Sequence, residues 1–226
     1  MSLGSDATGD LYYRNSSGNL TRLGIGANNY VVTSNGTTPV WGPNVGGGMT
    51  YLCTITANNS TSLNNASPTS GSCPINSTYT SYKLVFENLA PATNERIMEL
   101  QVHSANGGAS YKTSGYLTSY TQNYAGTTSG AAPTTYFPLS YPSASQGGSI
   151  ASGAPGLSGT VTIFAPAGGG LVMITIGDGG YLDGSGDPIS TSVSGYWNTA
   201  AAVDGFQVLM DSGNLTSGSI LVYGVQ

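Results

Sequence analysis

The chain of 226 residues carries a formal net charge of -5, and charged residues make up 7% of it, against roughly 25% in an average soluble domain. Its five Lys and Arg residues exclude the basic surface that nucleic-acid binding requires. No apolar run approaches the ~20 residues of a membrane span, and no basic segment followed by an apolar one predicts a signal peptide. A surface of Ser, Thr, Asn and Tyr suits neutral polar partners such as sugars.

Residues 9–42 read GDLYYRNSSGNLTRLGIGANNYVVTSNGTTPVWG, a pattern that predicts two successive β-hairpins. The first joins LYYR to LTRL through Ser17-Gly18-Asn19, and the second joins YVVT to PVW through Ser34-Asn35-Gly36. Asn and Gly between short apolar segments are the usual hairpin signal. A segment of about 34 residues with so few apolar side chains cannot close a core alone.

The triple glycine Gly46-Gly47-Gly48 follows these hairpins and predicts a flexible hinge or a tight crossing. We therefore divide the chain into an N-terminal segment, residues 1–48, and a head domain, residues 49–226.

The sequence of the head domain predicts β-strands and no helix. Tyr116, Tyr120 and Tyr124 recur at helical spacing, but they lie among Thr, Ser and Gly, which are poor helix formers. We expect residues 158–166 and 170–177 to form one hairpin, and residues 205–211 and 217–225 to form another. The expected fold class is thus all-β, with an extended N-terminal segment followed by an antiparallel β-sandwich head of jelly-roll-like type. The strand patterns cover residues 49–57, 82–89, 96–104, 158–166, 170–177, 205–211 and 217–225.

The two cysteines, Cys53 and Cys73, flank a stretch rich in Ser and Asn. One pair is not a disulfide framework, and two interpretations stay open: buried, unpaired thiols or one disulfide across the loop. A zinc site is not expected, because His103 is the only histidine and zinc needs three or four ligands.

The acidic residues show no arrangement typical of catalysis. Glycosidases need two carboxylates about 5–9.5 Å apart, and nothing singles out a pair among the ten Asp and Glu residues. No G-x-S-x-G motif accompanies His103. Asp178, Asp183 and Asp187 lie among glycines, but their spacing does not follow the EF-hand pattern. We interpret them as solvated turn residues, with calcium as the alternative, and expect no catalytic residue, metal site or cofactor.

Tyrosine is the residue type that points to recognition. The chain has 15 Tyr residues, and residues 113–177 contain no Asp, Glu, Lys, Arg or His. A tyrosine combines a flat apolar ring with a hydroxyl at small entropic cost, although such rings also cap β-sandwich cores. For the region as a whole we predict ligand binding, and the candidate residues are Tyr111, Tyr116, Tyr120, Tyr124, Gln122, Asn123, Tyr196 and Trp197.

Three stretches resemble known proteins. Residues 9–42 resemble the GDLLYR…GNLTRL.IG..G.VLTSNGT.P.W segments of bacteriophage tail-fibre and other virion fibre proteins. Residues 82–116, YKLVFENLAPATNERIMELQVHSANGGASYKTSGY, are similar to a Y.LVL.N..PAT....L.LQVS..GG.TY..SGY stretch near the ends of such proteins. SGSILVYGVQ is similar to their SG.I.VYG ending. The resemblance leaves residues 117–141 uncovered.

The resemblance implies a phage virion fibre or receptor-binding tip protein, made in the bacterial host cytoplasm and carried on the particle. Its partners would be two further copies of itself in a homotrimer, other virion proteins and a bacterial surface saccharide, with no nucleic acid and no membrane insertion. The N-terminal segment would be a trimerising fibre or collar, in which three chains share one core. The apolar residues of that core would be Tyr12, Leu20, Leu23, Ile25, Val31, Val32 and Trp41.

Alternatives stay open for both parts. The N-terminal segment is either a trimeric collar or an arm packed on its own head. The head is an adhesive domain, a polysaccharide depolymerase, or a ligand-free structural or decoration module of the virion.

Overall fold

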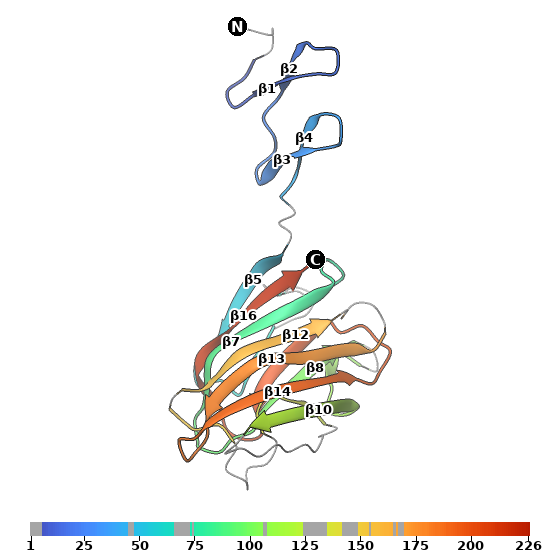
Figure 1. Cartoon of the computed structure of the whole chain (residues 1–226). Coiled ribbons are helices and arrows are strands. Elements are labelled where there is room, and N and C mark those ends of the chain that lie inside the picture. Colours follow the sequence, from blue (N-terminus) through green and yellow to red (C-terminus); the bar gives the residue numbers. More distant parts are fainter. Residues whose placement is uncertain are drawn as a thin grey trace. The chain divides into compact units, whose positions relative to one another are not determined.

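A computed structural model of the chain shows an all-β protein (Figure 1). Every strand pairing is antiparallel, and the described part contains no helix long and apolar enough to span a bilayer. The expected fold class is therefore confirmed at the level of an antiparallel, β-sandwich-like architecture. The chain divides into two compact units, Met1–Gly47 and Gly48–Gln226. The structure describes residues 6–44, 48–65, 73, 75–105, 108–123, 135–141, 149–153, 155–164, 166 and 170–226.

The first unit consists of the two expected hairpins (Figure 1). In the first, β1 (Leu11–Arg14) pairs with β2 (Leu20–Leu23). In the second, β3 (Tyr30–Ser34) pairs with β4 (Pro39–Pro43).

Asparagine and glycine shape both turns. The Oδ1 atoms of Asn15 and Asn35 each accept two backbone N–H groups of their own turn, at 2.8–3.1 Å. An asparagine side chain that bonds in this way replaces a backbone turn contact. Gly18 and Gly36 adopt φ values of 80° and 90°, which only glycine reaches without strain.

Asp10 and Trp41 stiffen the first unit. The Asp10 carboxylate forms an ion pair with Arg22 at 2.9 Å. The Trp41 indole N–H donates to the Gly24 carbonyl at 2.5 Å. A Cβ on Gly26 would come within 2.4 Å of the same indole ring, so Trp41 packs directly on the backbone there.

The second unit contains a seven-stranded sheet in the order β10-β14-β13-β12-β7-β16-β5 (Figure 1). Its strands are β5 (Met49–Thr56), β7 (Ser81–Pro91), β10 (Tyr116–Asn123), β12 (Leu157–Phe164), β13 (Val172–Leu182), β14 (Pro188–Trp197) and β16 (Leu215–Val225).

A five-stranded sheet forms the other layer, in the order β11-β8-β15-β6, with β9 paired to β8. Its strands are β6 (Ser62–Asn64), β8 (Met98–Ser104), β9 (Ser110–Tyr111), β11 (Phe137–Pro138) and β15 (Gly205–Met210).

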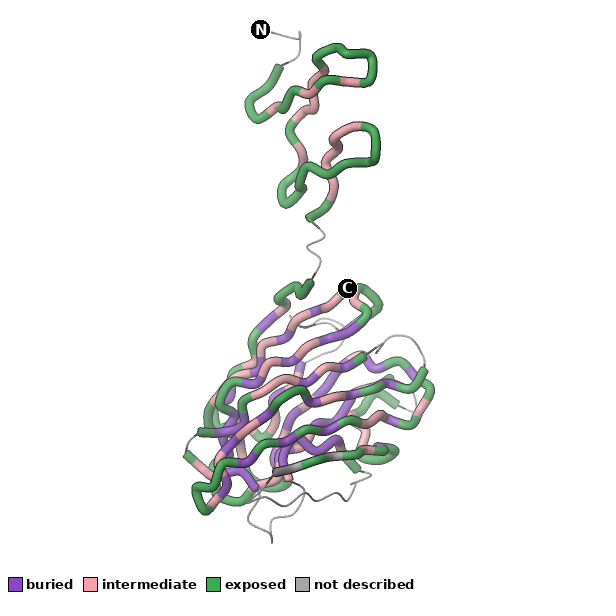
Figure 2. The backbone as a smooth tube through the Cα atoms, in the orientation of Figure 1, coloured by how far each residue is buried: buried purple, intermediate pink, exposed green. Residues whose placement is uncertain are grey.

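The core lies between these sheets, and Figure 2 marks the buried residues of the strands in purple. Alternating residues enter it, as the period of two in a strand requires. On β12, Val161 and Ile163 are buried. Thr160 and Thr162, which alternate with them along the strand, face outward. β8 contributes Val102 to the same hydrophobic cluster from the opposite sheet.

One expected hairpin is confirmed and the other is wrong. β12 pairs with β13 as predicted. β15 and β16 instead belong to different sheets, since β15 pairs with β8 and β6 while β16 lies between β7 and β5. Met210 and Leu215, on either side of the intervening turn, are both buried. The turn therefore carries the chain from one layer to the other, so that both strands fill the same core.

A disulfide joins Cys53 of β5 to Cys73, and the two Cα atoms are 5.6 Å apart, within the range that such a bridge needs. Both residues are buried in the hydrophobic cluster. The structure thus selects the disulfide over the unpaired thiols.

The variant C53A/C73A tests this bridge. We expect it to lower the free energy of unfolding by about 3 kcal/mol, because the disulfide closes a loop of about 20 residues in the unfolded chain. Urea unfolding of the oxidised parent, the reduced parent and the variant measures the effect. Equal unfolding midpoints for the oxidised and reduced parent would contradict it.

Candidate binding surfaces

The first unit leaves its apolar side chains uncovered. None of residues 6–44 is buried, and Figure 2 accordingly shows no buried backbone in this unit. Ile25 is 62% exposed, while Leu23 and Trp41 are half-buried within their own unit. This unit therefore has no core of its own. Its exposed large apolar residues are Leu11, Tyr12, Leu20, Ile25, Tyr30, Val31 and Val32.

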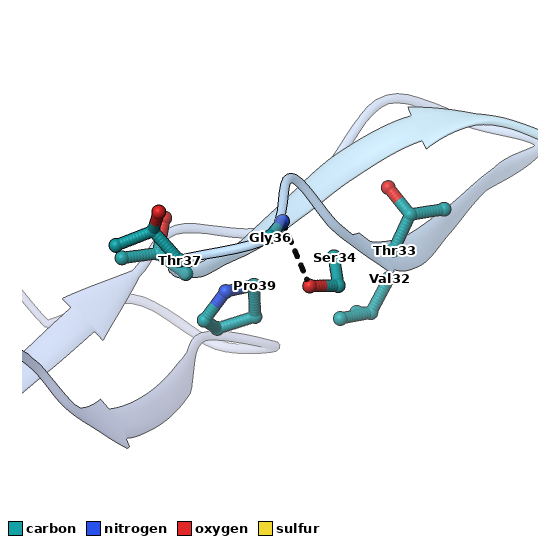
Figure 3. A pocket seen from close by; sticks show the side chains of 7 residues that line it. Val32, Thr33, Ser34, Gly36, Thr37 and Pro39 are labelled. Carbon is teal, nitrogen blue, oxygen red and sulfur yellow. Dashed lines mark hydrogen bonds between the residues drawn. The ribbon is translucent and has the colours of Figure 1, made fainter.

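The second hairpin carries a shallow depression in which part of this apolar surface lies (Figure 3). Val32 and Pro39 border it from opposite strands, and the Gly36 N–H donates to the Ser34 hydroxyl oxygen at 3.1 Å across the tip. The remaining lining residues are Thr33, Thr37 and Thr38. The depression thus combines apolar contact area with a hairpin tip held in shape.

In the second unit, four large apolar side chains are cross-strand neighbours in one row on the outer face of the seven-stranded sheet. Phe164 of β12 pairs with Met173 of β13, Met173 with Tyr196 of β14, and Tyr196 with Leu117 of β10. Met173 is 50% exposed, and Phe164 and Leu117 are also exposed. We call these four residues the apolar row.

A second row, of hydroxyl side chains, runs beside the first. Thr162 pairs with Thr175, Thr175 with Ser194, and Ser194 with Ser119, on the same four strands. We call these four residues the hydroxyl row. A groove lies along both rows at the β10 side of the sheet, and it is lined by Leu117, Thr118, Ser119, Met173, Ser194, Gly195 and Tyr196.

This part of the outer face carries no charge. β10, β12 and β14 contain no Asp, Glu, Lys, Arg or His, and β13 contains one aspartate, Asp178, beyond the two rows. A ligand with a phosphate or carboxylate group would find no basic partner on these four strands. The groove fits neutral, polar ligands with an apolar side.

The structure places two of the predicted site residues in the core. Tyr116 is fully buried; its hydroxyl donates to the Lys112 carbonyl at 3.0 Å and accepts the Val102 N–H at 2.8 Å. Burial raises the pKa of this phenol far above its usual range. The Trp197 ring is buried, and its indole N–H donates to the Ser114 carbonyl at 3.2 Å. These rings are covered on both faces, which leaves Tyr196 as the aromatic residue of that pair at the groove.

The other predicted residues lie elsewhere or outside the described side chains. Tyr111 is half-buried against His103, with ring centroids 5.2 Å apart, and burial raises its pKa. The backbones of Tyr120, Gln122 and Asn123 belong to β10 and pair with β14, but their side chains are outside the described part. Tyr124 is outside it altogether. The sequence pattern did not identify Leu117 and Met173 as site residues, because their outward position follows only from strand register.

Glu99 of β8 is the acidic residue with the most altered titration. Burial raises its pKa to about 7, and the charge of Asp211 adds to the effect. Asp211 accepts the Ile97 backbone N–H at 3.1 Å and lies 3.7 Å from the Arg96 guanidinium. A half-buried carboxyl with a pKa near neutral pH, raised further by the charge of a second carboxylate, is a pattern that acid–base chemistry uses.

His103 pairs with Asp204 at the ends of β8 and β15. Its Nδ1 lies 2.5 Å from the Asp204 carboxylate, and the Asp204 N–H donates to the His103 carbonyl at 3.1 Å. The neighbouring Ser104 hydroxyl donates to the Ala202 carbonyl at 2.6 Å. These contacts cross-link two strand ends and account for the histidine structurally.

The aspartates among the glycines form no metal cluster in the described residues. Asp183 is buried in the turn between β13 and β14, where its Oδ1 accepts the N–H groups of Ser185 and Asp187 at 2.9 and 2.8 Å. Asp178 is exposed on β13. In this arrangement Asp183 shapes the turn.

Comparison of the chain with protein-family models, with curated proteins and with solved structures found no match. The two uncovered apolar surfaces and the Glu99–Asp211 pair are therefore interpreted from their own chemistry.

The raised pKa of Glu99 predicts a pH dependence of stability. The folded state holds a proton that the unfolded state releases, so between pH 4.5 and about 7 the stability contribution of Glu99 falls as pH rises. We expect E99Q to raise the melting temperature at pH 8 and to leave it nearly unchanged at pH 4. Thermal unfolding of parent and variant at both pH values measures this, with E87Q as the exposed control. An equal shift at both pH values would contradict the prediction.

Proposed function

We propose that this protein is a homotrimeric virion fibre or receptor-binding tip protein of a bacteriophage that adheres to host surface glycans without cleaving them. Residues 1–48 form its trimeric collar, and residues 49–226 form a jelly-roll-like head. The resemblance of residues 9–42 and 82–116 to virion fibre proteins supports the class. The observation that carries the proposal is the absence of any buried residue in residues 6–44.

Two hairpins without a core are marginally stable in water. The exposed apolar side chains of the first unit gain about 25 cal/mol for each Å² removed from water, and an identical copy offers the same apolar surface. Assembly with two other copies therefore supplies the core that one chain lacks. Folding of the unit is linked to association, and the trimer stabilises it by mass action.

Adhesion follows from the head surface. Its uncharged groove offers an apolar row and a hydroxyl row, which matches the two kinds of surface on a sugar ring. A single shallow site of this kind binds weakly, because sugar–protein hydrogen bonds replace water hydrogen bonds with little net gain. Three heads on one trimer raise the effective affinity through multivalency.

The assembly prediction is tested by the mass of the particle in solution. Light scattering coupled to size exclusion is expected to report three chains for the parent at micromolar concentration. The variant I25S/V32S removes two exposed apolar side chains from the first unit. Its trimer is expected to dissociate at a protein concentration at least about tenfold higher than the parent trimer does, because burial of each side chain contributes roughly 1.5–3 kcal/mol.

The matched control is L171S, which removes an equally exposed apolar side chain from the head and is expected to stay trimeric. A monomeric parent would contradict the collar and would favour an arm packed on its own head.

The Glu99–Asp211 pair carries the second candidate function, a polysaccharide depolymerase. We expect no reducing ends when the protein is incubated with host capsule or lipopolysaccharide glycans. Release of reducing ends by the parent but not by E99Q, with E95Q as the acidic control, would establish the hydrolase instead. A flat response to a broad glycan array and to whole host cells would favour a ligand-free decoration module.

A further inference from the structure

We propose that the outer face of the seven-stranded sheet binds an extended, unbranched, neutral saccharide chain that runs across the strands, along the apolar and hydroxyl rows. The inference rests on the proposed adhesive function and names the shape and direction of the ligand. It places recognition on a sheet face formed by β12, β13, β14 and β10.

The spacing of the apolar row supports a repeating ligand. Neighbouring strands lie about 4.8 Å apart, so the three steps from Phe164 to Leu117 span about 14 Å. One strand step is close to the length of one pyranose unit in an extended chain. An extended saccharide across the strands therefore meets one side chain of the apolar row at each unit, for up to four units.

The chemistry of the two rows matches the two surfaces of a sugar ring. A pyranose presents C–H groups on its faces and hydroxyls at its rim. Met173 and Tyr196 offer apolar contact in the groove, and Ser194 and Ser119 offer hydroxyl donors and acceptors two residues further along the strands. A chain that lies between the rows satisfies both kinds of contact at every step.

The groove is backed by a close strand contact. A Cβ on Gly195 would come within 2.5 Å of the Leu117 carbonyl oxygen, so β10 lies tight against β14 at this point. The rows therefore stand on paired strands, and a ligand does not have to order them on binding. Less entropy is lost on binding than at a mobile loop.

The two ends of the rows indicate that the protein binds an interior stretch of a long saccharide chain. Among the described residues, β10 is the outermost strand of the sheet, so no described strand continues the rows beyond Leu117. At the other end the pairing continues to β7, where Ser81 follows Phe164 and Lys83 follows Thr162. The apolar row thus stops at four residues, and affinity is expected to rise with chain length up to about four units.

The experiment uses the full-length protein and four series of linear neutral oligosaccharides, β-1,4-linked glucose, mannose, xylose and N-acetylglucosamine, each from one to six units. Titration calorimetry is expected to show at least one series whose affinity increases several-fold for each added unit up to four units and then stays flat. M173S is expected to weaken that binding about fivefold or more, since it truncates a central contact.

The matched control is M49S, because Met49 is as exposed as Met173 but lies on β5 at the opposite edge of the same sheet. It is expected to bind like the parent. Both variants are expected to keep the parent's melting temperature within a few degrees, since both residues are half-exposed.

The outcomes separate this inference from the proposed function. Binding without length dependence, or equal binding by M173S and the parent, overturns the groove and leaves glycan adhesion standing. Attachment to host cells without affinity for any linear series overturns it in the same way. No binding to cells or glycans overturns both. Loss of trimers in M173S, but not in M49S, would show that a second copy of the chain covers the rows instead.

Discussion

Residues 6–44 leave their apolar side chains uncovered, and the stability of this unit depends on how that surface is removed from water. Two hairpins are well formed internally, with capped turns at Asn15 and Asn35 and a tryptophan packed on Gly26, yet none of their residues is buried. Local hydrogen bonds specify the hairpins but do not remove apolar area from water. The stabilising free energy has to come from contacts outside this unit, and the proposed trimer would supply them from identical copies with matching chemistry.

The head solves the same problem within one chain. Its two sheets bury a hydrophobic cluster between them, and a disulfide joins Cys53 of β5 to Cys73 within that cluster. Because the core is complete without the outer face, side chains there are free to serve recognition. The rows on β12, β13, β14 and β10 carry no charge, so the same composition that makes the protein poor in ion pairs makes this face suited to neutral ligands.

Much of the fold is predictable from residue patterns, since period-two alternation identifies most long strands, and turns that contain Gly and Asn identify the N-terminal hairpins. β10 was missed because Tyr, Ser, Thr and Gln alternate there without clear hydrophobic contrast. The predicted hairpin between β15 and β16 is wrong, because a short loop between two strands can either close a hairpin or carry the chain from one sheet to the other. Sequence also could not separate Tyr196 at the groove from Trp197 in the core, since adjacent strand residues face opposite layers and register decides which.

Hydrogen exchange of the backbone amides in β1–β4 reports whether the first unit is ordered and whether association with other copies orders it. In the assembled parent these amides are expected to be protected, whereas in I25S/V32S they are expected to exchange rapidly while the head amides stay protected. Rapid exchange of β1–β4 in the parent, or equal protection in parent and variant, would contradict the account, since the unit would then not depend on partner copies for its core.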